Sequence, residues 1–209
     1  AFQVNGEAVG VMAAVCKQYG TQFLHLSTDY VFDGKASQPY KESDPVHPQS
    51  VYGASKLEGE RQAILYCPEA IIIRTSWVYS EFGKNFVKTM LKLMAEKEEI
   101  RVVNDQLGSP TYAADLAKAI LVIISSGKWV PGVYHFSNDG IISWYDFAVE
   151  IARMTGSQCK VLPIPGSEYP SPAKRPAWSV LDHNKIREVY GIQGRPWKES
   201  LQECLLQLK

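Results

Sequence analysis

Two short, continuous runs of apolar residues constrain the fold of this chain more than any other feature. The runs are Phe23-Leu24-His25-Leu26 and Ala70-Ile71-Ile72-Ile73-Arg74, and each follows a segment with helical periodicity. A strand that is apolar at successive positions is buried on both faces, which is typical of a parallel sheet covered by helices. The two runs therefore predict the centre of an α/β fold.

Strand and helix patterns alternate along the chain as far as Gly156. Helices are expected over about 5–19, 50–66, 85–97, 112–126 and 143–155, and strands over about 22–26, 70–74, 100–103 and 133–136. This alternation predicts a Rossmann-like parallel sheet with helices on both faces. Ser143 is expected to cap the last of these helices, with Asp146 at its third position. After Gly156, five prolines between 161 and 176 predict an extended loop, and two short helices are expected near 183–190 and 196–207.

Composition limits the classes of function. The 209 residues are 45% hydrophobic, and the 22 Lys and Arg are balanced by 22 Asp and Glu. This balance predicts no nucleic-acid partner, and the apolar runs are too short to predict a membrane partner. The cysteines lie far apart without metal-ligand spacing, so we expect free thiols and a cytoplasmic location; they are Cys16, Cys67, Cys159 and Cys204.

The stretch from Ser27 to Lys56 holds the residues with the clearest chemistry. Tyr52 and Lys56 are four residues apart in a predicted helix, so their Cβ atoms lie roughly 5–6 Å apart on one face. A nearby ammonium stabilises a phenolate and lowers its pKa, which suits a general acid. Thr28 ends the first apolar strand, where the ligand crevice of an α/β sheet opens. We expect these three side chains to converge, although the Tyr–Lys spacing by itself fits a solvated helix face equally well.

Longer motifs surround this pair. They are STDYVFDG from Ser27, YGASKLEGE from Tyr52, RTSWVYS from Arg74, GKNF from Gly83, DQLGSPT from Asp105 and RPAWSVLD from Arg175. In their order, and over nearly the whole chain, these motifs resemble the extended short-chain dehydrogenases/reductases, and more narrowly the dTDP-4-dehydrorhamnose reductase family. The resemblance implies that NADPH or NADH reduces the 4-keto group of a dTDP-4-keto-6-deoxy sugar, which would convert dTDP-4-dehydro-L-rhamnose to dTDP-L-rhamnose in dTDP-rhamnose biosynthesis.

The resemblance assigns catalytic and cofactor roles residue by residue. Tyr52 would donate the proton, Lys56 would hydrogen-bond the nicotinamide ribose, and Thr28 would hold the carbonyl oxygen. Thr75 and Ser76 are expected where the backbone approaches the nicotinamide, with Tyr52 and Lys56 as further cofactor contacts. For Thr28 the alternative is a hydroxyl that caps a turn at the end of a strand.

The resemblance also implies a set of substrate-binding residues, to which Thr28 belongs. Asp29 is expected to line the sugar pocket, although an Asx-turn is an alternative use of that side chain. Trp77 would pack on the sugar, with core packing as the alternative. Asn85 and Arg175 are candidates for the diphosphate, because a guanidinium matches phosphate geometry. For Arg175 the alternative is a surface ion pair.

No group of histidines and carboxylates has metal-ligand spacing, so no metal-binding residue is predicted. Members of the family can use Mg²⁺ at a subunit contact, but no motif here identifies such a site. The glycine-rich G-x-G-x-x-G fingerprint of dinucleotide-binding folds does not occur in the 209 residues. We therefore expect the amino-terminal strands of the fold to be missing from this chain. The choice between NADH and NADPH depends on residues of that part.

The missing strands have a consequence for assembly. They would leave a sheet edge exposed, so we expect a homodimer or other self-association through that edge. By resemblance, residues 1–156 form a partial NAD(P)-binding core, and residues 157–209 form mainly a small substrate-binding lobe. The nucleotide-sugar substrate is then the expected small-molecule partner.

Two other functions remain open. One is a nucleotide-sugar epimerase or dehydratase on the same scaffold, although Asp29 is followed by Tyr30 and Val31 rather than by the adjacent base of a dehydratase. The other is a non-catalytic regulatory or binding subunit. The presence of both Tyr52 and Lys56 counts against that second alternative.

Overall fold

The computed structural model describes residues 1–169 and 175–208. Its centre is a parallel sheet of three strands in the order β1-β2-β7, formed by Leu24–Thr28, Ile71–Thr75 and Gly132–His135. The carboxyl ends of the first two strands are level, because Thr28 stands opposite Thr75 in the register. The two apolar runs of the sequence are thus strands of one parallel sheet, as predicted, and the structure shows that they are adjacent, with β1 at the edge.

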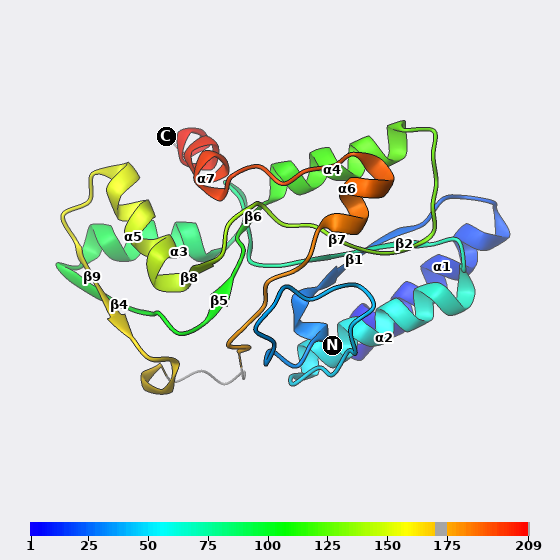
Figure 1. The fold of residues 1–209 in the computed structure, drawn as a ribbon, viewed down its shortest axis with the longest axis horizontal. Helices are drawn as coiled ribbons and strands as arrows, with labels where there is room; N and C mark the ends of the chain where they lie inside the picture. The colour runs from blue at the N-terminus through cyan, green and yellow to red at the C-terminus, as the bar shows by residue number, and fades with distance from the viewer. Residues whose placement is uncertain (170–174, 209) are drawn as a thin grey trace.

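Helices cover both faces of this sheet (Figure 1). On one face lie α1 (Ala8–Gln18), which follows a π-helical turn at Gln3–Glu7, and α2 (Val51–Tyr66). On the other face lie α4 (Ala113–Ser125) and α6 (Asn184–Tyr190). Successive residues of β2 supply the two cores: Ile72 packs in the α1–α2 cluster, whereas Ile71 and Ile73 pack in the α4–α6 cluster. All of β2 is buried, which explains its unbroken apolar sequence.

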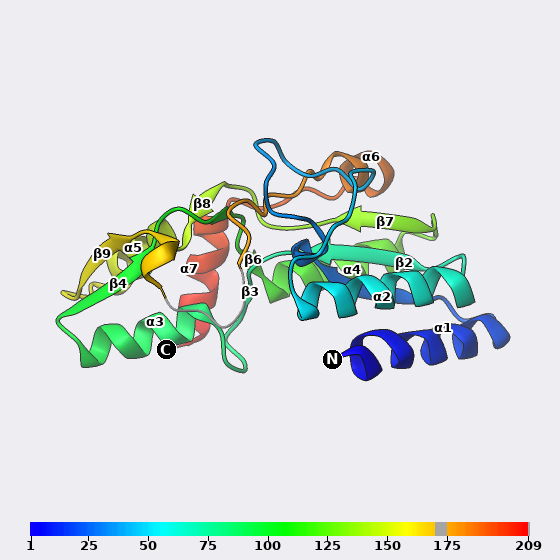
Figure 2. The same cartoon turned by 90° about the horizontal axis from the view of Figure 1, so that it is seen from below.

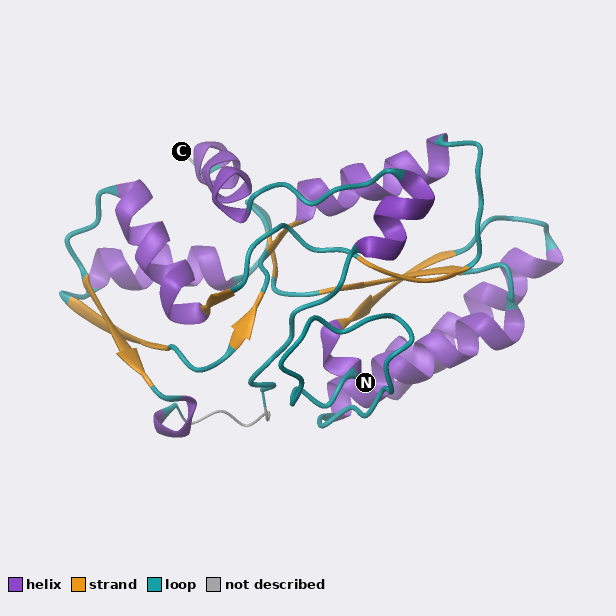
Figure 3. Ribbon diagram, in the orientation of Figure 1, coloured by secondary structure: helices purple, strands orange, loops and turns teal. Residues whose placement is uncertain are grey.

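A smaller lobe stands beside the sheet, to its left in Figures 1 and 3. Its helices are α3 (Phe86–Glu96), α5 (Trp144–Thr155) and α7 (Trp197–Gln207). Its short strands are β3 (Val78–Tyr79), β4 (Glu99–Val103), β5 (Leu107–Gly108), β6 (Thr111–Tyr112), β8 (Ile142–Ser143) and β9 (Lys160–Ile164). The turned view in Figure 2 shows the lobe and the sheet as neighbouring bodies joined by the β3 and β6 segments.

The packing divides the chain differently from the expected boundary at residue 156. The core of the smaller lobe joins residues from Tyr79 to Tyr112 with residues from Ile142 to Leu205 in one hydrophobic cluster. The lobe is therefore assembled from separate stretches of chain, several of which precede residue 156. Both the sheet and the smaller lobe contain alternating strands and helices. This alternation along the sequence therefore does not show where one body ends and the other begins.

Part of the expected loop over 161–176 is a strand. The strand β9 pairs in parallel with β4, and Pro163 stands opposite Val102. Proline is compatible with this position because β9 has one neighbour in its two-stranded sheet, so the missing N–H can face away from β4. The predicted strand near 100–103 accordingly belongs to the smaller lobe. Residues 170–174 of the expected loop lie outside the described part of the chain.

The predicted cap of α5 is confirmed and matters for the site. The Ser143 hydroxyl accepts a hydrogen bond from the Asp146 backbone N–H at 3.0 Å, and the Asp146 carboxylate accepts one from the Ser143 N–H at 2.9 Å. This capping box fixes the first turn of the helix, where Trp144 is the first residue.

No helix of the described residues combines the length and the apolar character needed to cross a bilayer.

Candidate active site

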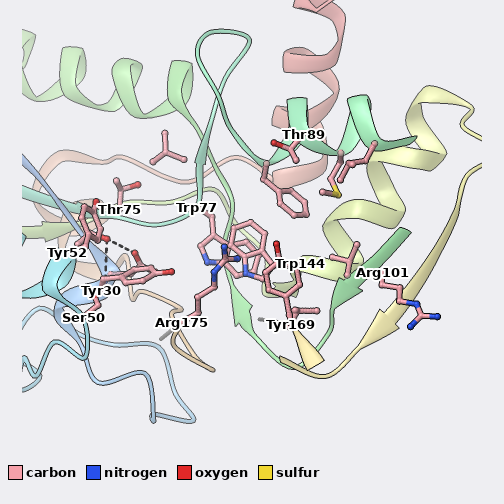
Figure 4. A pocket seen from close by; sticks show the side chains of 18 of the residues that line it. Tyr30, Ser50, Tyr52, Thr75, Trp77, Thr89, Arg101, Trp144, Tyr169 and Arg175 are labelled. Carbon is pink, nitrogen blue, oxygen red and sulfur yellow. Dashed lines mark hydrogen bonds between the residues drawn. The ribbon is translucent and has the colours of Figure 1, made fainter. Parts of the chain in front are cut away.

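A cavity of about 810 Å³ lies between the carboxyl end of the sheet and the smaller lobe (Figure 4). From the sheet side it is lined by Thr28, Tyr52 and Thr75, and from the lobe side by α3, β4 and the start of α5. A crevice outside the carboxyl ends of parallel strands is the usual ligand site of open α/β sheets. Its volume is also in the range of small-molecule sites in proteins.

Thr28 and Asp29 form a buried hydrogen-bonded unit at the end of β1. The Thr28 hydroxyl donates to Asp29 Oδ1 at 2.8 Å and accepts from the Tyr30 backbone N–H at 3.3 Å. Asp29 Oδ2 finds no hydrogen-bond partner among the described residues. Burial raises the pKa of Asp29 to about 7, and the Thr28 bond opposes that rise. Near neutral pH this carboxyl can therefore offer either a proton or a lone pair to a ligand.

Tyr52 lies in the first turn of α2, which begins at the Ser50 cap. The Ser50 hydroxyl accepts a hydrogen bond from Gly53 N–H at 3.1 Å, and this cap orients the turn that carries the phenol. The Tyr52 ring meets the Tyr30 ring edge-on, with centroids 5.8 Å apart. Partial burial raises the pKa of Tyr52, while the neighbouring Thr28 hydroxyl lowers it. Lys56 is not among the groups that shift the pKa of Tyr52 in this structure, and Thr28 supplies the lowering contact.

The Lys56 ammonium lies behind the cavity wall. Its Nζ donates to the Leu26 carbonyl at 2.6 Å and approaches His25 Nε2 to 3.4 Å. Burial and the Lys56 charge lower the pKa of His25 to about 4, so its neutral ring can accept that proton. Lys56 is not among the described residues that line the cavity. The structure therefore brings Thr28 and Tyr52 together at the cavity. The Lys56 side chain instead extends along β1, where the Leu26 carbonyl and the His25 ring accept its protons.

Trp77 forms one wall of the cavity together with Trp144. The two indoles are stacked, with centroids 3.5 Å apart and planes 8° from parallel. Among the described residues other than glycine, Trp77 is the one with a positive φ, +47°. Gly108 leaves room for this arrangement, since a Cβ there would lie 2.6 Å from the Trp77 ring. The structure thus places Trp77 in the cavity, as the sequence analysis expected, and adds a partner that it missed.

The two predicted nicotinamide neighbours differ in their surroundings. Thr75 lines the cavity at the end of β2, and its hydroxyl donates to the Thr111 hydroxyl at 3.3 Å. Ser76 is buried, and its hydroxyl donates to the Ser109 carbonyl at 2.7 Å. Ser76 is not among the described residues that line the cavity. Its hydrogen bond to Ser109 connects the segment after β2 to the smaller lobe.

Asn85 has a structural task in this structure, and its diphosphate contact stays a prediction. It caps α3, where Oδ1 accepts from Lys88 N–H at 3.2 Å and Nδ2 donates to the Ser80 carbonyl at 2.6 Å. Asn85 is also absent from the described lining of the cavity, because both ends of its amide are engaged in this turn. The motif GKNF placed Asn85 near the site correctly, but an asparagine before a helix is equally a capping residue.

Arg175 does line the cavity. It approaches from the carboxyl-terminal segment, and its guanidinium lies 5.8 Å from the centre of the Tyr169 ring. Figure 4 shows the Arg175 side chain extending toward Trp77 and Trp144. Cationic and aromatic groups therefore share this end of the cavity, which is a chemistry suited to a phosphate joined to a ring.

Several lining residues were missed by the sequence analysis, namely Tyr30, Ser50, Phe86, Thr89, Trp144 and Tyr169. A signal existed for Trp144, because the capping box places it at the first position of α5. Tyr30 also had a signal, since it follows Asp29 directly after a buried strand. Ser50 is the cap of α2, and the remaining residues come from α3 and from the segment after β9, which periodicity does not connect to the sheet.

The cavity fits the reacting end of a nicotinamide cofactor and a hydroxyl-bearing substrate. Tyr52 and Thr75 both reach it, and Asp29 Oδ2, unpartnered among the described residues, is an acceptor that a bound hydroxyl would satisfy. The 209 residues contain no glycine-rich fingerprint for the pyrophosphate. Among the described side chains no group of three or more His, Cys, Asp and Glu could hold a metal ion.

Comparison with known proteins identifies the family. The family model "RmlD substrate binding domain" matches residues 1–209. The spore coat polysaccharide biosynthesis protein SpsK of Bacillus subtilis is 48% identical over 205 residues, covering 98% of this chain and 71% of that protein.

Two solved structures share the fold closely. A dTDP-4-dehydrorhamnose reductase of Clostridium acetobutylicum has a TM-score of 0.94 and 45% identity, covering 100% of this chain and 73% of the other. The dTDP-4-dehydrorhamnose reductase of Bacillus anthracis, solved in complex with NADP, has a TM-score of 0.95 and 38% identity, covering 99% and 73%. The chain therefore belongs to the dTDP-4-dehydrorhamnose reductase (RmlD) family and spans about 70% of the length of these relatives.

Proposed function

We propose that the protein reduces the 4-keto group of a dTDP-4-keto-6-deoxy sugar, taking dTDP-4-dehydro-L-rhamnose to dTDP-L-rhamnose. The observation that carries this proposal is the convergence of Thr28, Tyr52 and Trp77 on one cavity at the carboxyl end of the sheet. Family membership supports the reaction, because relatives that match nearly the whole chain are dTDP-4-dehydrorhamnose reductases. The hydride is supplied by NADPH or NADH when the cofactor is bound, and the NADP complex of a relative favours the former.

The chemistry assigned to the sheet side is proton donation. As hydride arrives at the carbonyl carbon, negative charge develops on the oxygen, and a phenol within reach can neutralise it. Tyr52 would be this donor, and the Thr28 hydroxyl beside it would hold the same oxygen. That role requires Thr28 to turn its proton from Asp29 Oδ1, to which it donates at 2.8 Å, toward the substrate. When Thr28 turns away, Asp29 Oδ1 loses this hydrogen-bond donor. Because the pKa of Asp29 is about 7, the carboxyl can bind a proton in its place.

Binding is assigned mainly to the lobe side. The stacked Trp77 and Trp144 offer a flat apolar surface to the sugar or base, and Arg175 offers charge to the diphosphate. Asp29 would accept or donate a hydrogen bond to a sugar hydroxyl. Thr75 and Tyr52 would border the nicotinamide. Lys56 reaches a ribose only after leaving the Leu26 carbonyl, so its cofactor contact requires a change of rotamer.

We propose self-association as a further property of the chain. In the described structure β1 is an edge strand with β2 as its sheet neighbour, and Leu26 on it is 39% exposed. Val11 and Val15 on α1 are also exposed, so the chain presents apolar side chains in addition to the open edge. Light scattering during size-exclusion chromatography tests this proposal. A monomer at high protein concentration would contradict it.

Two alternatives are tested by the same assays. An epimerase or dehydratase on this scaffold would convert nucleotide sugars without net consumption of NADPH. A non-catalytic regulatory subunit would bind a protein partner in stoichiometric amount and would not respond to Tyr52→Phe. The cavity with a phenol, a hydroxyl and a carboxyl at one end favours the reductase over the binding subunit.

The decisive experiment is NADPH oxidation with dTDP-4-dehydrorhamnose, followed at 340 nm together with product analysis. It is run on the 209-residue chain and on the same chain joined at its amino terminus to a glycine-rich strand–turn–helix segment of a dinucleotide-binding fold. Tyr52→Phe should lower kcat by roughly 10²–10⁴, whereas Tyr66→Phe, a matched change at the far end of α2, should leave it unchanged. Full activity in Tyr52→Phe would reject the proposal.

A further inference from the structure

The carboxylate of Glu60 is buried in the interior between α2 and the sheet, and the chemistry proposed above does not use it. Its side chain is 4% exposed. Arg74 binds it through two parallel hydrogen bonds, from Nε to Oε1 at 2.9 Å and from Nη2 to Oε2 at 2.7 Å. The Ser27 hydroxyl also donates to Oε1. A charge this deeply buried is costly unless it is paired, so the site is built to hold a carboxylate.

Glu60 belongs to the same face of α2 as the predicted catalytic pair. It follows Lys56 by one helical turn and Tyr52 by two, so the three side chains form one row. The Lys56 ammonium binds the Leu26 carbonyl, and the Glu60 carboxylate binds the hydroxyl of Ser27, the next residue of β1. Two successive residues of the strand are therefore held by two successive turns of the helix.

The residues that Glu60 holds stand directly behind the site. Ser27 precedes Thr28 on β1, and Arg74 precedes Thr75 on β2. Thr28 and Thr75 are opposite each other in the sheet register and both line the cavity. One carboxylate thus connects the helix that carries Tyr52 to the two strand ends that face it.

We propose that Glu60 is a positioning residue for the Tyr52–Lys56 pair: through its bonds to Arg74 and Ser27 it fixes α2 on the strand ends, one helical turn from Lys56. The role of that pair in reduction rests on the proposed function, whereas the link from Glu60 to Lys56 does not. Electrostatics support the link, because burial lowers the pKa of Lys56 and the Glu60 carboxylate raises it.

The other titratable and charged groups on the elements packed around α2 do not replace Glu60. They are His25 on β1, Asp29 and Tyr30 in the turn after it, Tyr52, Glu58, Arg61 and Tyr66 on α2 itself, Glu7 in the amino-terminal turn, Cys16 and Lys17 on α1, and Arg74 on β2. The pKa of His25 is about 4, so its ring is neutral where a reductase would work. The positive charge of Arg74 forms an ion pair with Glu60 itself. Glu60 is the carboxylate that acts on the pKa of Lys56.

The test measures the titration of Lys56 by NMR in the 209-residue chain with ¹⁵N-labelled lysine, without cofactor or substrate. The Lys56 signal is identified by its loss in Lys56→Met. In Glu60→Gln the pKa of Lys56 should fall below its value in the unchanged chain, and in Glu60→Asp it should fall less. Glu150→Gln is the matched control, because Glu150 is also a buried helical carboxylate but pairs with Arg153 and Lys198 in the smaller lobe. A folded Glu60→Gln chain with an unchanged Lys56 titration would overturn the proposal.

A second measurement covers the case in which Glu60→Gln does not fold, since that change leaves Arg74 buried without its counter-charge. With ¹³C-labelled glutamate, the carboxyl signal of Glu60 in the unchanged chain should show a step at the pH where Lys56 titrates. Lys56→Met should abolish the step. A Glu60 signal that stays flat through the Lys56 titration would overturn the proposal without any Glu60 variant.

Activity separates this proposal from the proposed function. In an active enzyme, Glu60→Gln should lower kcat and move the alkaline limb of its pH profile to lower pH, while KM changes by less than about twofold. Glu60→Asp should restore part of kcat. If the chain shows the coupling between Glu60 and Lys56 but no reductase activity, the proposed function fails and the positioning role stands. If Tyr52→Phe abolishes activity and the coupling is absent, the proposed function stands and the positioning role of Glu60 fails.

Discussion

Trp77 lies flat against Trp144, with ring centroids 3.5 Å apart and planes 8° from parallel. The contact joins the end of the segment after β2 to the first residue of α5, so it spans the junction between the sheet and the smaller lobe. Stacked indoles bury a large apolar area and hold each other in one orientation. The pair thereby fixes the wall of the cavity to which we assign the sugar nucleotide.

Removing the partner indole should loosen this wall. In Trp144→Ala we expect the Kd for dTDP, measured by calorimetry, to rise about tenfold, because an aromatic surface worth ~1–1.5 kcal/mol is lost. Trp129→Phe is the matched control, since Trp129 donates to the Glu69 carbonyl far from the cavity. Unchanged dTDP affinity in Trp144→Ala would show that the indole pair is a packing contact only.

Asn85 and Arg175 should respond to mutation in opposite ways. Asn85→Ala removes the cap of α3, so the free energy of unfolding should fall by about 1 kcal/mol while dTDP affinity stays the same. Arg175→Gln should leave the free energy of unfolding within about 0.5 kcal/mol, because the side chain is exposed. Its dTDP affinity should fall at least tenfold if the guanidinium binds the diphosphate. Urea denaturation and calorimetry on both variants check these outcomes, and a loss of affinity in Asn85→Ala would show that its amide also contacts the ligand.

The buried carboxyl of Asp29 should make stability depend on pH. Folding raises its pKa from 3.8 to about 7, so the folded state favours the protonated form. The stability of the chain should therefore decrease as pH rises from about 4 to 7, and the penalty should stay constant above pH 7. Asp29→Asn has no such penalty, so its advantage in the free energy of unfolding should grow over this range to at most roughly 4 kcal/mol. Urea denaturation at several pH values measures it, and a difference that is constant from pH 4 to 8 would contradict the raised pKa.

Two glycines on the helices beside the site should tolerate alanine differently. A Cβ on Gly53 would lie 2.1 Å from the Tyr30 carbonyl oxygen, so Gly53→Ala must push the start of α2 away from the cavity. We expect a loss of about 3 kcal/mol in the free energy of unfolding and reduced dTDP affinity. A Cβ on Gly6 would lie 3.1 Å from Glu58 Cγ, an atom of a side chain that can move. Gly6→Ala should therefore change stability by less than about 1 kcal/mol, and equal effects of the two changes would contradict the close approach of Tyr30.

Much of the site could be predicted because local patterns carry it. The apolar runs around Leu24 and Ile72 predicted buried strands of a parallel sheet, and the position of Thr28 after the first run predicted its place at the cavity. Motif resemblance added Trp77 and Arg175, which do line the cavity. Trp144 and Tyr169 were missed, because nothing in the local pattern connects those segments to the end of β2.

The sequence by itself determined the seven α-helices of the described residues and the strands β1, β2, β4 and β7, where α5 is capped, and which family the motifs resemble. These properties depend on neighbours within a few residues, so periodicity and short motifs record them. The tertiary structure decided that residues on both sides of position 156 share one lobe, that β9 continues through Pro163, and that Lys56 binds the Leu26 carbonyl while Glu60 binds Ser27. Those outcomes depend on which acceptors and apolar surfaces meet when distant segments pack together, and only the folded chain brings these groups within contact distance.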